Sequence, residues 1–420
     1  MERTSVELFA GGGGLVQAAT KAGFTHLLAN EFAKRACETL VANGFEGYEE
    51  GTPSSVLEAA AGTPLVVGDV RKLDMRYLAD RDVDLLAGGP PCQPFSLGGV
   101  AKGDEDDRNM FPEMFRAVRE MRPKAVLCEN VRGLLRPSFS SYFDYIQREL
   151  SLPFVERGEA TWQEHNQVLL ERLKDDDGDP SERYEVRKFP VNAADYGVPQ
   201  IRNRVILIAF RADVGVDWNI FNEAVEPTHS EESLIQSFHD DTYWQDHPKV
   251  PKRVRDSVKS RYPEKLFRPD GDRLLPWRTL RDAIRGLPSI DLDKQDKKTA
   301  QGGVPDHVGW PGARVYAGHT PNELDRPAKT VKAGVHGVPG GESVMLLDQR
   351  ERSEDAPGGW RHLYRYMTVR EAARVMTFRD DWALCGPRGE KMRQLGNAVP
   401  VDLGAVFMNA VKTVLDKAES

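Results

Sequence analysis

The sequence predicts an α/β fold: an open and largely parallel sheet, accompanied by a smaller, irregular second region. Through the first 210 residues, short apolar runs alternate with stretches of helical periodicity, as in parallel sheets with crossover helices. A run of glycines, residues 11–14, follows the first apolar run and precedes a helical stretch, as in nucleotide-binding sheets. From about residue 211 to residue 355 the alternation is lost, and Pro, Gly, Trp and Arg are scattered through irregular sequence.

The expected elements follow one another in a simple order. Strands are predicted at residues 6–10, 25–31, 64–70, 83–89 and 125–131, and helices at 15–22 and 111–121. Residues 184–193 and 204–210 resemble an antiparallel pair joined by a turn. Thr368, with Glu371 three residues later, predicts a capped helix over 368–378. The last 18 residues or so, from Val401, have an apolar face suited to docking as a helix.

This pattern predicts the domain organisation. Residues 1–210 form the larger domain, which is expected to bind a cofactor and carry the chemistry, and residues 385–420 return to it. Residues 211–384 form the smaller domain. Residues 151–182 resemble an insertion, because a helical stretch there is followed by the polar run "KDDDGDPSE".

Composition excludes several classes of protein. No apolar run approaches the ~20 residues that cross a bilayer, and the first residues do not form a signal peptide. The expected location is therefore cytoplasmic, with no membrane partner. The four cysteines, Cys37, Cys92, Cys128 and Cys385, lie far apart without a C-x-x-C pair, so neither a metal site nor a disulfide framework is expected.

The charge of the chain is unevenly distributed. The formal net charge is −8, which argues weakly against a nucleic-acid partner. Between residues 249 and 285, however, twelve Lys or Arg stand against five Asp or Glu. Such a segment is expected where one face of an acidic protein meets a polyanion. A merely solvated basic face is an equally good interpretation from charge alone.

A cofactor pocket is predicted where the first strands end. Gly11 and Gly13 allow the backbone to pass close to a ligand. Glu31 ends the second strand, 20 residues after Gly11, where an acid reaches ribose hydroxyls. Asp69 follows the third strand and could accept a hydrogen bond from an adenine amino group, and Phe9 could stack on the adenine. The pattern indicates an adenosine-type cofactor, either NAD or S-adenosylmethionine.

The stretch "VDLLAGGPPCQPFSLGG", residues 83–99, separates these two cofactors. Cys92 follows the carboxyl end of a strand, in the expected crevice, between Pro91 and Gln93-Pro94. Prolines fix φ and lower the entropy of a loop that must hold a nucleophile still. Hydride transfer needs no thiol at this place, whereas some methyl transfers do, so the stretch favours S-adenosylmethionine.

"PPCQPFS" resembles the catalytic motif of the DNA cytosine-5 methyltransferases, and five further motifs of that family follow the family's order. They are "ELFAGGGG" (7–14), "ENV" (129–131), "QIRNR" (200–204), "RPAKTV" (326–331) and "QLGNAVPV" (394–401). The resemblance covers most of residues 5–210 and 325–410, and the family carries its target-recognition region between "QIRNR" and "RPAKT". It implies a class I, Rossmann-like methyltransferase sheet, S-adenosylmethionine as cofactor, and a small target-recognition domain.

The resemblance also implies a role for each motif residue. Cys92 would add to C6 of a cytosine and make C5 nucleophilic, Glu129 would assist at N3, and Arg204 would donate to O2. Arg202 would steady a phosphate or a loop. Pro91 and Asn397 would lie near the cofactor. The DNA itself would be contacted by residues of the nucleophile loop and of the "QIRNR" motif: Gln93, Ser96, Arg108 and Gln200.

Two alternatives remain open from the sequence. An RNA cytosine-5 methyltransferase uses the same motifs, although members that act on tRNA tend to have Thr where this chain has Ser96. A catalytically silent DNA-binding relative is the other, and the intact Cys92, Glu129 and Arg204 argue against it. The expected partners are double-stranded DNA, bound by a monomer, and a cognate restriction endonuclease that acts on the same site.

Overall fold

The structure is a computed structural model that describes residues 2–91, 109–174, 178–263, 274–292, 299–315, 320–333, 343–354 and 356–420. The chain forms two compact units. Unit 1 comprises Met1–Val191, Asn203–Glu226 and Gly404–Ser420, and unit 2 comprises Asn192–Arg202 and Pro227–Leu403. The functional domains predicted at 1–210 with 385–420, and at 211–384, stay a prediction, because compactness assigns no function.

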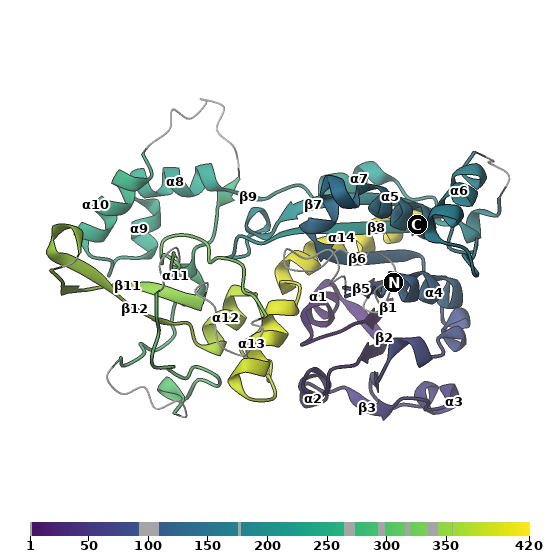
Figure 1. Ribbon diagram of the computed structural model, residues 1–420, viewed down its shortest axis with the longest axis horizontal. Helices are drawn as coiled ribbons and strands as arrows, with labels where there is room; N and C mark the ends of the chain where they lie inside the picture. The colour runs from purple at the N-terminus through teal and green to yellow at the C-terminus, as the bar shows by residue number, and fades with distance from the viewer. Residues whose placement is uncertain are drawn as a thin grey trace. The chain divides into compact units, whose positions relative to one another are not determined.

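Unit 1 is built on one eight-stranded sheet in the order β3-β4-β2-β1-β5-β6-β8-β7 (Figure 1). The six strands from β3 to β6 in this order pair in parallel, and β8 joins β6 antiparallel. The strands are β1 (Arg3–Leu8), β2 (Phe24–Glu31), β3 (Glu46–Glu49), β4 (Pro64–Val67), β5 (Leu85–Gly88), β6 (Ala125–Val131), β7 (Tyr184–Asn192) and β8 (Asn203–Arg211).

Helices follow most of these strands, as the alternating pattern predicts. They are α1 (Gly14–Ala22), α2 (Lys34–Ala42), α3 (Ser54–Glu58), α4 (Phe111–Met121), α5 (Ser140–Ser151), α6 (Trp162–Arg172), α7 (Trp218–Ala224) and α14 (Val401–Ala418). Short 3-10 turns lie at Val70–Lys72, Arg76–Arg81, Arg132–Leu135, Pro137–Phe139, Pro180–Glu182 and Ala212–Val214. The predicted α/β class is confirmed.

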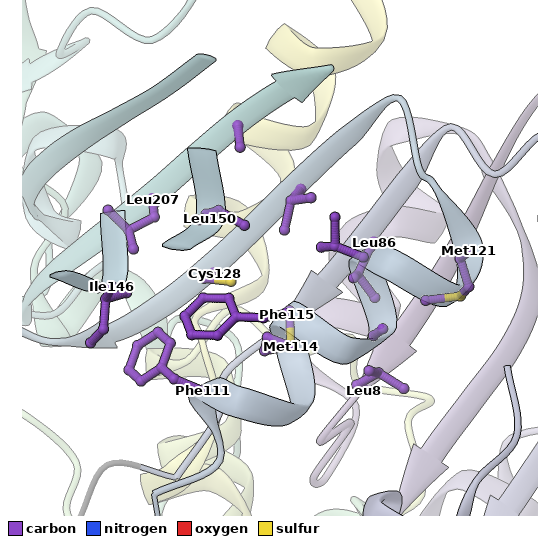
Figure 2. Packing of buried hydrophobic residues seen from close by; sticks show 14 of the residues in the cluster. Leu8, Leu86, Phe111, Met114, Phe115, Met121, Cys128, Ile146, Leu150 and Leu207 are labelled. Atoms are coloured by element: carbon purple, nitrogen blue, oxygen red, sulfur yellow. The ribbon is translucent and has the colours of Figure 1, made fainter. Parts of the chain in front are cut away.

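One face of the sheet is covered by α4 and α5. The apolar residues of α4 recur at helical spacing, so that Phe111, Met114 and Phe115 all point into one buried cluster. Figure 2 shows these side chains against Leu86 and Cys128 of the neighbouring strands β5 and β6. Because side chains alternate along a strand, the opposite face needs a separate core. There the aromatic residues of α7 and α14 pack against those of β7 and β8 in one cluster: Trp218, Phe221, Phe407, Phe189 and Phe210.

The strand bounds differ from the prediction at a few places. β4 ends at Val67 instead of residue 70, because the Asp69 side chain accepts a hydrogen bond from the Arg71 amide and caps a 3-10 turn. The short edge strand β3, Glu46–Glu49, was not predicted. Its sequence, EGYE, lacks the apolar alternation by which a strand can be recognised.

The regular elements of unit 2 are short helices and two short sheets, joined by long irregular segments. Its helices are α8 (Glu231–His239), α9 (Thr242–Asp246), α10 (Lys252–Arg261), α11 (Leu280–Ala283), α12 (Val369–Val375) and α13 (Arg388–Asn397), with 3-10 turns at Ala193–Tyr196, Gln301–Gly303 and Pro357–Gly359. β9 (His229–Ser230) pairs with β10 (Leu275–Pro276), and β11 (Val344–Arg352) forms an antiparallel ribbon with β12 (Trp360–Tyr366). The predicted capping box is confirmed: the Thr368 side chain accepts from the Glu371 amide, and the Glu371 carboxylate accepts from the Thr368 amide.

Residues 388–418 are long and apolar enough to cross a membrane by length and composition, contrary to the expectation that no such run exists. In the most apolar part of this stretch, however, 72% of the residues are buried inside the protein. That degree of burial is typical of a core helix, and α14 docks on the sheet as predicted.

Candidate active site

The predicted site residues of unit 1 that the structure describes gather at one edge of the sheet. Parallel strands bring their carboxyl ends to the same edge, and the strand order reverses between β1 and β5. Open α/β sheets bind ligands in the crevice outside such a switch point. The loop after β1, Glu31 at the end of β2, Asp69 after β4 and Glu129 near the end of β6 all lie at this edge.

The loop after β1 depends on its glycines. Gly11 and Gly13 have φ angles of 56° and 94°, in the left-handed region that suits glycine, and α1 starts directly afterwards. Phe9 also has a positive φ of 55°, which is uncommon for an aromatic residue and marks a strained turn at this point. Phe9 packs in part against the buried cluster of unit 1, so its stacking on an adenine stays a prediction.

Glu31 shapes the same loop. Its Oε2 accepts a hydrogen bond from the Gly11 amide at 2.7 Å, and its Oε1 accepts from the Phe32 and Ala33 amides at 2.9 and 2.7 Å. Burial raises the pKa of Glu31, and the three amide donors lower it by less than burial raises it. A carboxylate has about four lone-pair sites, so three amide contacts leave capacity for a ribose hydroxyl.

Asp69 lies at the same edge but has a charged partner. The Arg71 guanidinium donates to both of its carboxylate oxygens, at 2.9 to 3.0 Å from Nε. This hydrogen bond holds the pKa of Asp69 below its ordinary value, so the group stays ionised. An ionised carboxylate is able to accept from an adenine amino group, and this role of Asp69 stays a prediction.

The structure adds Phe32, which the sequence analysis missed. It follows Glu31 directly and is 75% exposed. No other large apolar residue among the described ones is exposed to this extent. An exposed aromatic ring beside an acid that faces a ligand crevice is a natural stacking platform. A signal was present in the sequence, since an aromatic residue after the last residue of a parallel strand is already at the carboxyl edge.

The backbone before the predicted nucleophile is held at two points. Asn130 donates from Nδ2 to the Pro90 carbonyl at 3.0 Å, and the Met110 amide donates to the Pro91 carbonyl at 3.3 Å. The predicted residues Cys92, Gln93, Ser96 and Arg108 lie outside the described residues, and their roles stay predictions. Their flanking residues belong to the same edge of the sheet as Glu129.

Two of the other cysteines are poor candidates for a nucleophile. Cys37 and Cys128 are buried, and burial raises the pKa of each thiol to about 12. Both are therefore protonated at neutral pH, and a thiol is a far weaker nucleophile than a thiolate. Their predicted role as small buried apolar residues is confirmed, whereas Cys385 is only half-buried.

Glu129 and Arg204 form an ion pair at the end of β6. The Arg204 Nε lies 2.6 Å from the Glu129 Oε1, and both side chains are mostly buried. Within the described part of the chain, no donor is aligned for a hydrogen bond to this oxygen. A Cβ at Gly89 would lie 3.6 Å from the Glu129 Oε2, so a glycine brings the backbone that leads to Cys92 close to the carboxylate.

The remaining predicted residues belong to unit 2. Gln200 is fully buried: its Oε1 accepts from the Val331 amide at 3.0 Å, and its Nε2 points at the Met376 sulfur at 2.9 Å. Arg202 is also buried and donates to three main-chain carbonyls: Val331, Gly396 and Ala398.

These contacts join "QIRNR", "RPAKTV" and "QLGNAVPV" within one unit. A DNA contact by Gln200 would require its packing to open, and the catalytic role of Arg202 stays a prediction. Asn397 is the exposed last residue of α13, and its place near the cofactor also stays a prediction.

The fold and this edge define a class of protein: an α/β protein in which an acid–arginine pair lies at the same sheet edge as the predicted nucleoside pocket. The sequence matches the family of C-5 cytosine-specific DNA methylases over residues 3–152 and 163–413. The chain therefore belongs to this family. The internal stretch outside the match, 153–162, is shorter than the predicted insertion at 151–182. It is a DNA (cytosine-5-)-methyltransferase that takes its methyl group from S-adenosylmethionine.

Individual relatives agree with this assignment. The chain is 29% identical to the Type II methyltransferase M.Eco47II of Escherichia coli, over 99% of this chain and 80% of that protein. It is 30% identical to the Type II methyltransferase M.PspPI of Psychrobacter sp., over 98% and 80%. The S. pombe Dnmt2 methyltransferase has a similar fold, with a TM-score of 0.53 and 16% identity over 99% of each chain, which confirms the class I methyltransferase fold.

Proposed function

We propose that this enzyme methylates cytosine in a specific sequence of duplex DNA through a covalent bond between Cys92 and C6. The observation that supports it is the position of the Glu129–Arg204 pair. It lies at the same edge as the predicted nucleoside pocket, beside the backbone that leads to Cys92. A thiolate that adds at C6 needs a proton or a strong hydrogen bond at N3 of the ring, and a carboxyl group at this place can supply it.

The reaction balances with these residues. The Cys92 sulfur forms a bond to C6 while N3 takes a proton from Glu129, which makes C5 nucleophilic. S-adenosylmethionine, when bound, supplies an electrophilic methyl group to C5. Loss of the C5 proton to a base, for which water is suitable, then expels the Cys92 thiolate, and N3 returns its proton to Glu129 as the aromatic ring is restored. Arg204 would hold the cytosine O2 and keep the ring in register with Glu129.

The carboxyl edge fits the adenosine part of the cofactor. Glu31 would accept from the ribose hydroxyls, Asp69 from the adenine amino group, and the glycine loop would pass beside the methionine part. We assign the stacking surface to Phe32 in addition to Phe9, because the Phe32 ring is already exposed at this edge. The place of Pro91 and Asn397 near the cofactor rests on the family motifs.

The target base is stacked inside duplex DNA, so it must be extruded into the pocket. Gln93, Ser96, Arg108 and Gln200 are the proposed DNA contacts. We favour duplex DNA over RNA because the matched family acts on DNA and because Ser96 follows "PCQPF". We further propose that the enzyme binds DNA as a monomer in the cytoplasm, and that it protects sites cut by a cognate restriction endonuclease, since its relatives are named Type II methyltransferases.

A direct test is to express the enzyme with a plasmid and to sequence the plasmid for 5-methylcytosine. Methylation at one sequence context is expected in duplex DNA, with none in tRNA. DNA that carries 5-fluorocytosine at that context cannot lose a proton from C5, so it should trap a covalent adduct with the wild type. A Cys92→Ser variant that still methylates at near the wild-type rate would exclude the covalent route.

A further inference from the structure

The far end of the β11–β12 ribbon in unit 2 carries two arginines on one face. The strands pair Arg350 with His362, Glu351 with Arg361, and Arg352 with Trp360. Directly paired residues of antiparallel strands point to the same side, and successive pairs alternate between the sides. Arg350, Arg352, His362 and Trp360 therefore share one side, which we call the ribbon face, and the Glu351–Arg361 pair lies on the other.

Neutral groups orient both arginines of the ribbon face. The Arg350 Nε donates to the His362 Nε2 at 3.2 Å, and the His362 Nδ1 lies 2.6 Å from the Leu347 carbonyl. His362 therefore carries its proton on Nδ1 and is uncharged in this arrangement. The Arg352 guanidinium lies 5.5 Å from the centre of the Trp360 ring, which is 48% exposed.

Within the described part of the chain, the charge of these arginines is therefore not compensated. Among the described residues, no carboxylate lies within ion-pair distance of Arg350 or Arg352. On the opposite side, by contrast, the Arg361 Nε lies 2.5 Å from the Glu351 Oε1, and this exposed pair is neutral as a whole. One ribbon thus presents a cationic side and a neutral side.

The neighbouring helix α10 adds to the cationic side chains of this region. The Arg253 Nη2 donates to the Asp348 carbonyl at 2.8 Å, so the first turn of α10 lies beside β11. Lys252 and Arg253 are both exposed. Part of the basic segment that the sequence shows at 249–285 is therefore next to the ribbon. The ribbon extends this segment with Arg350 and Arg352, which lie 97 and 99 residues beyond Arg253.

We propose that the ribbon face binds the phosphate backbone of the substrate DNA, with Arg350 and Arg352 as the contacting residues. The neutral partners fix the orientation of the two guanidinium groups but do not neutralise their charge. Both groups can therefore bind phosphate oxygens. A two-stranded ribbon is also narrow enough to lie along a groove of B-DNA. The inference rests on the proposed function, and it places a DNA contact beyond "RPAKTV", outside the stretch between residues 204 and 326 in which the family resemblance expects target recognition.

The test uses three variants of the ribbon face: Arg350→Ala, Arg352→Ala and the double variant that carries both changes. Arg361→Ala is the control. All three single changes remove one arginine from the same ribbon, and only Arg361 lies on the neutral side. The dissociation constant for a duplex is measured by fluorescence anisotropy over a range of salt concentrations, after thermal melting confirms that each variant is folded. Duplexes with and without the methylated sequence are compared.

Each ribbon-face variant should raise the dissociation constant about tenfold on every duplex. The slope of log K against log salt should fall by about one for each arginine removed. Arg361→Ala should stay within about twofold of the wild type, and Arg352→Lys should keep the wild-type slope because it keeps the charge. An unchanged slope in the double variant, an equal loss in Arg361→Ala, or a loss confined to the duplex that contains the target sequence would each overturn the proposal.

The outcome is distinguishable from a failure of the proposed function. A wild type that binds duplexes but does not methylate them would contradict the function, while the salt slopes of the variants would still decide the role of the ribbon. A wild type that methylates DNA, together with ribbon-face variants that bind as the wild type does, would contradict this inference alone.

Discussion

The two edges of the sheet in unit 1 use charged residues in opposite ways. At the carboxyl edge, Glu31 is held by three backbone amides, and Glu129 has a single cation beside it. At the amino edge, the buried Arg3 contacts Asp84, Asp416 and Glu419 at 2.8 to 2.9 Å, and Lys124 contacts Asp84 and Glu419 at 3.1 and 2.9 Å.

The comparison indicates how one sheet separates chemistry from stability. At the amino edge, Arg3 and Lys124 each pair with several carboxylates, so their charges are balanced by groups of the protein itself. These ion pairs hold the end of α14 against the sheet. At the carboxyl edge, Glu31 is fixed by amide groups and keeps its geometry with no cationic partner among the described residues, whereas Asp69 and Glu129 each have one arginine beside them. Substitutions at the two edges should therefore separate a loss of rate from a loss of stability.

The largest effect is expected at the carboxyl edge. Glu129→Gln keeps the shape of the side chain but cannot give a proton to N3, so the single-turnover methylation rate should fall by about 10²–10⁴-fold. Binding of cofactor and DNA, and the melting temperature, should change little. A melting temperature that falls strongly while the chemical step is nearly unaffected would assign Glu129 to structure, and the comparison of the edges would fail.

The converse effect is expected at the amino edge. Asp84→Ala leaves the buried Arg3 and Lys124 with fewer counter-charges, and it removes the acceptor for the Thr4 amide. Breaking a buried ion pair in this way costs about 3–5 kcal/mol of unfolding free energy, which denaturant melts can measure. Asp74→Ala, which breaks an exposed pair with Arg76, is the control and should cost little. The folded fraction of Asp84→Ala should methylate DNA at the wild-type rate.

A smaller effect is expected for the stacking surface. Phe32→Ala should raise the dissociation constant for S-adenosylmethionine about tenfold, since stacking on an aromatic side chain contributes about 1–3 kcal/mol per base. Val41→Ala removes another exposed apolar side chain, on the helix that follows β2, and is the matched control. Isothermal titration calorimetry would measure both. Equal affinity of Phe32→Ala and the wild type would return the stacking role to Phe9.

The smallest effect is expected for the pH dependence of stability, from the His26–Glu7 pair between the two edges. Burial lowers the pKa of His26, but the Glu7 carboxylate, whose Oε2 lies 2.8 Å from the His26 Nδ1, raises this pKa by more, and the net shift is upward. The stabilising contribution is complete below the ordinary pKa of histidine and is lost as the pH rises through the raised value.

The melting temperature of the wild type should therefore fall, by more than that of His26→Gln, across the interval that starts at the ordinary histidine pKa of about 6.5 and extends to higher pH. Parallel melting curves for the two proteins across this interval would show that the pair contributes no pH-dependent stability.

Residues that a local pattern places were predictable from the sequence. Glu31, Asp69 and Glu129 each stand at or near the end of an apolar run, and parallel pairing brings such ends together, so the carboxyl edge could be assembled without a structure. The capping box at Thr368 and the docked last helix depend on equally local signals.

Residues that depend on distant partners were not predictable. Gln200 is buried because Val331 and Met376 fold over it, from more than a hundred residues further along the chain. Arg3 finds its partners 81 and 413 residues away. The exposure of Phe32 depends on the path of the chain after β2. No periodic pattern in the sequence carries that information, because it arises only when the elements pack together.

The course of α14 has a consequence for the synthesis of the enzyme. This single helix begins within unit 2, up to Leu403, and from Gly404 onwards it belongs to unit 1. Asp416 in this helix contacts the buried Arg3, which is synthesised 413 residues earlier. Domains usually fold in order as they are translated, but the eight-stranded sheet of unit 1 lacks one of its packing helices until residues 404–418 have been made. A nascent chain that ends before residue 404 would therefore be unable to complete the packing of that sheet.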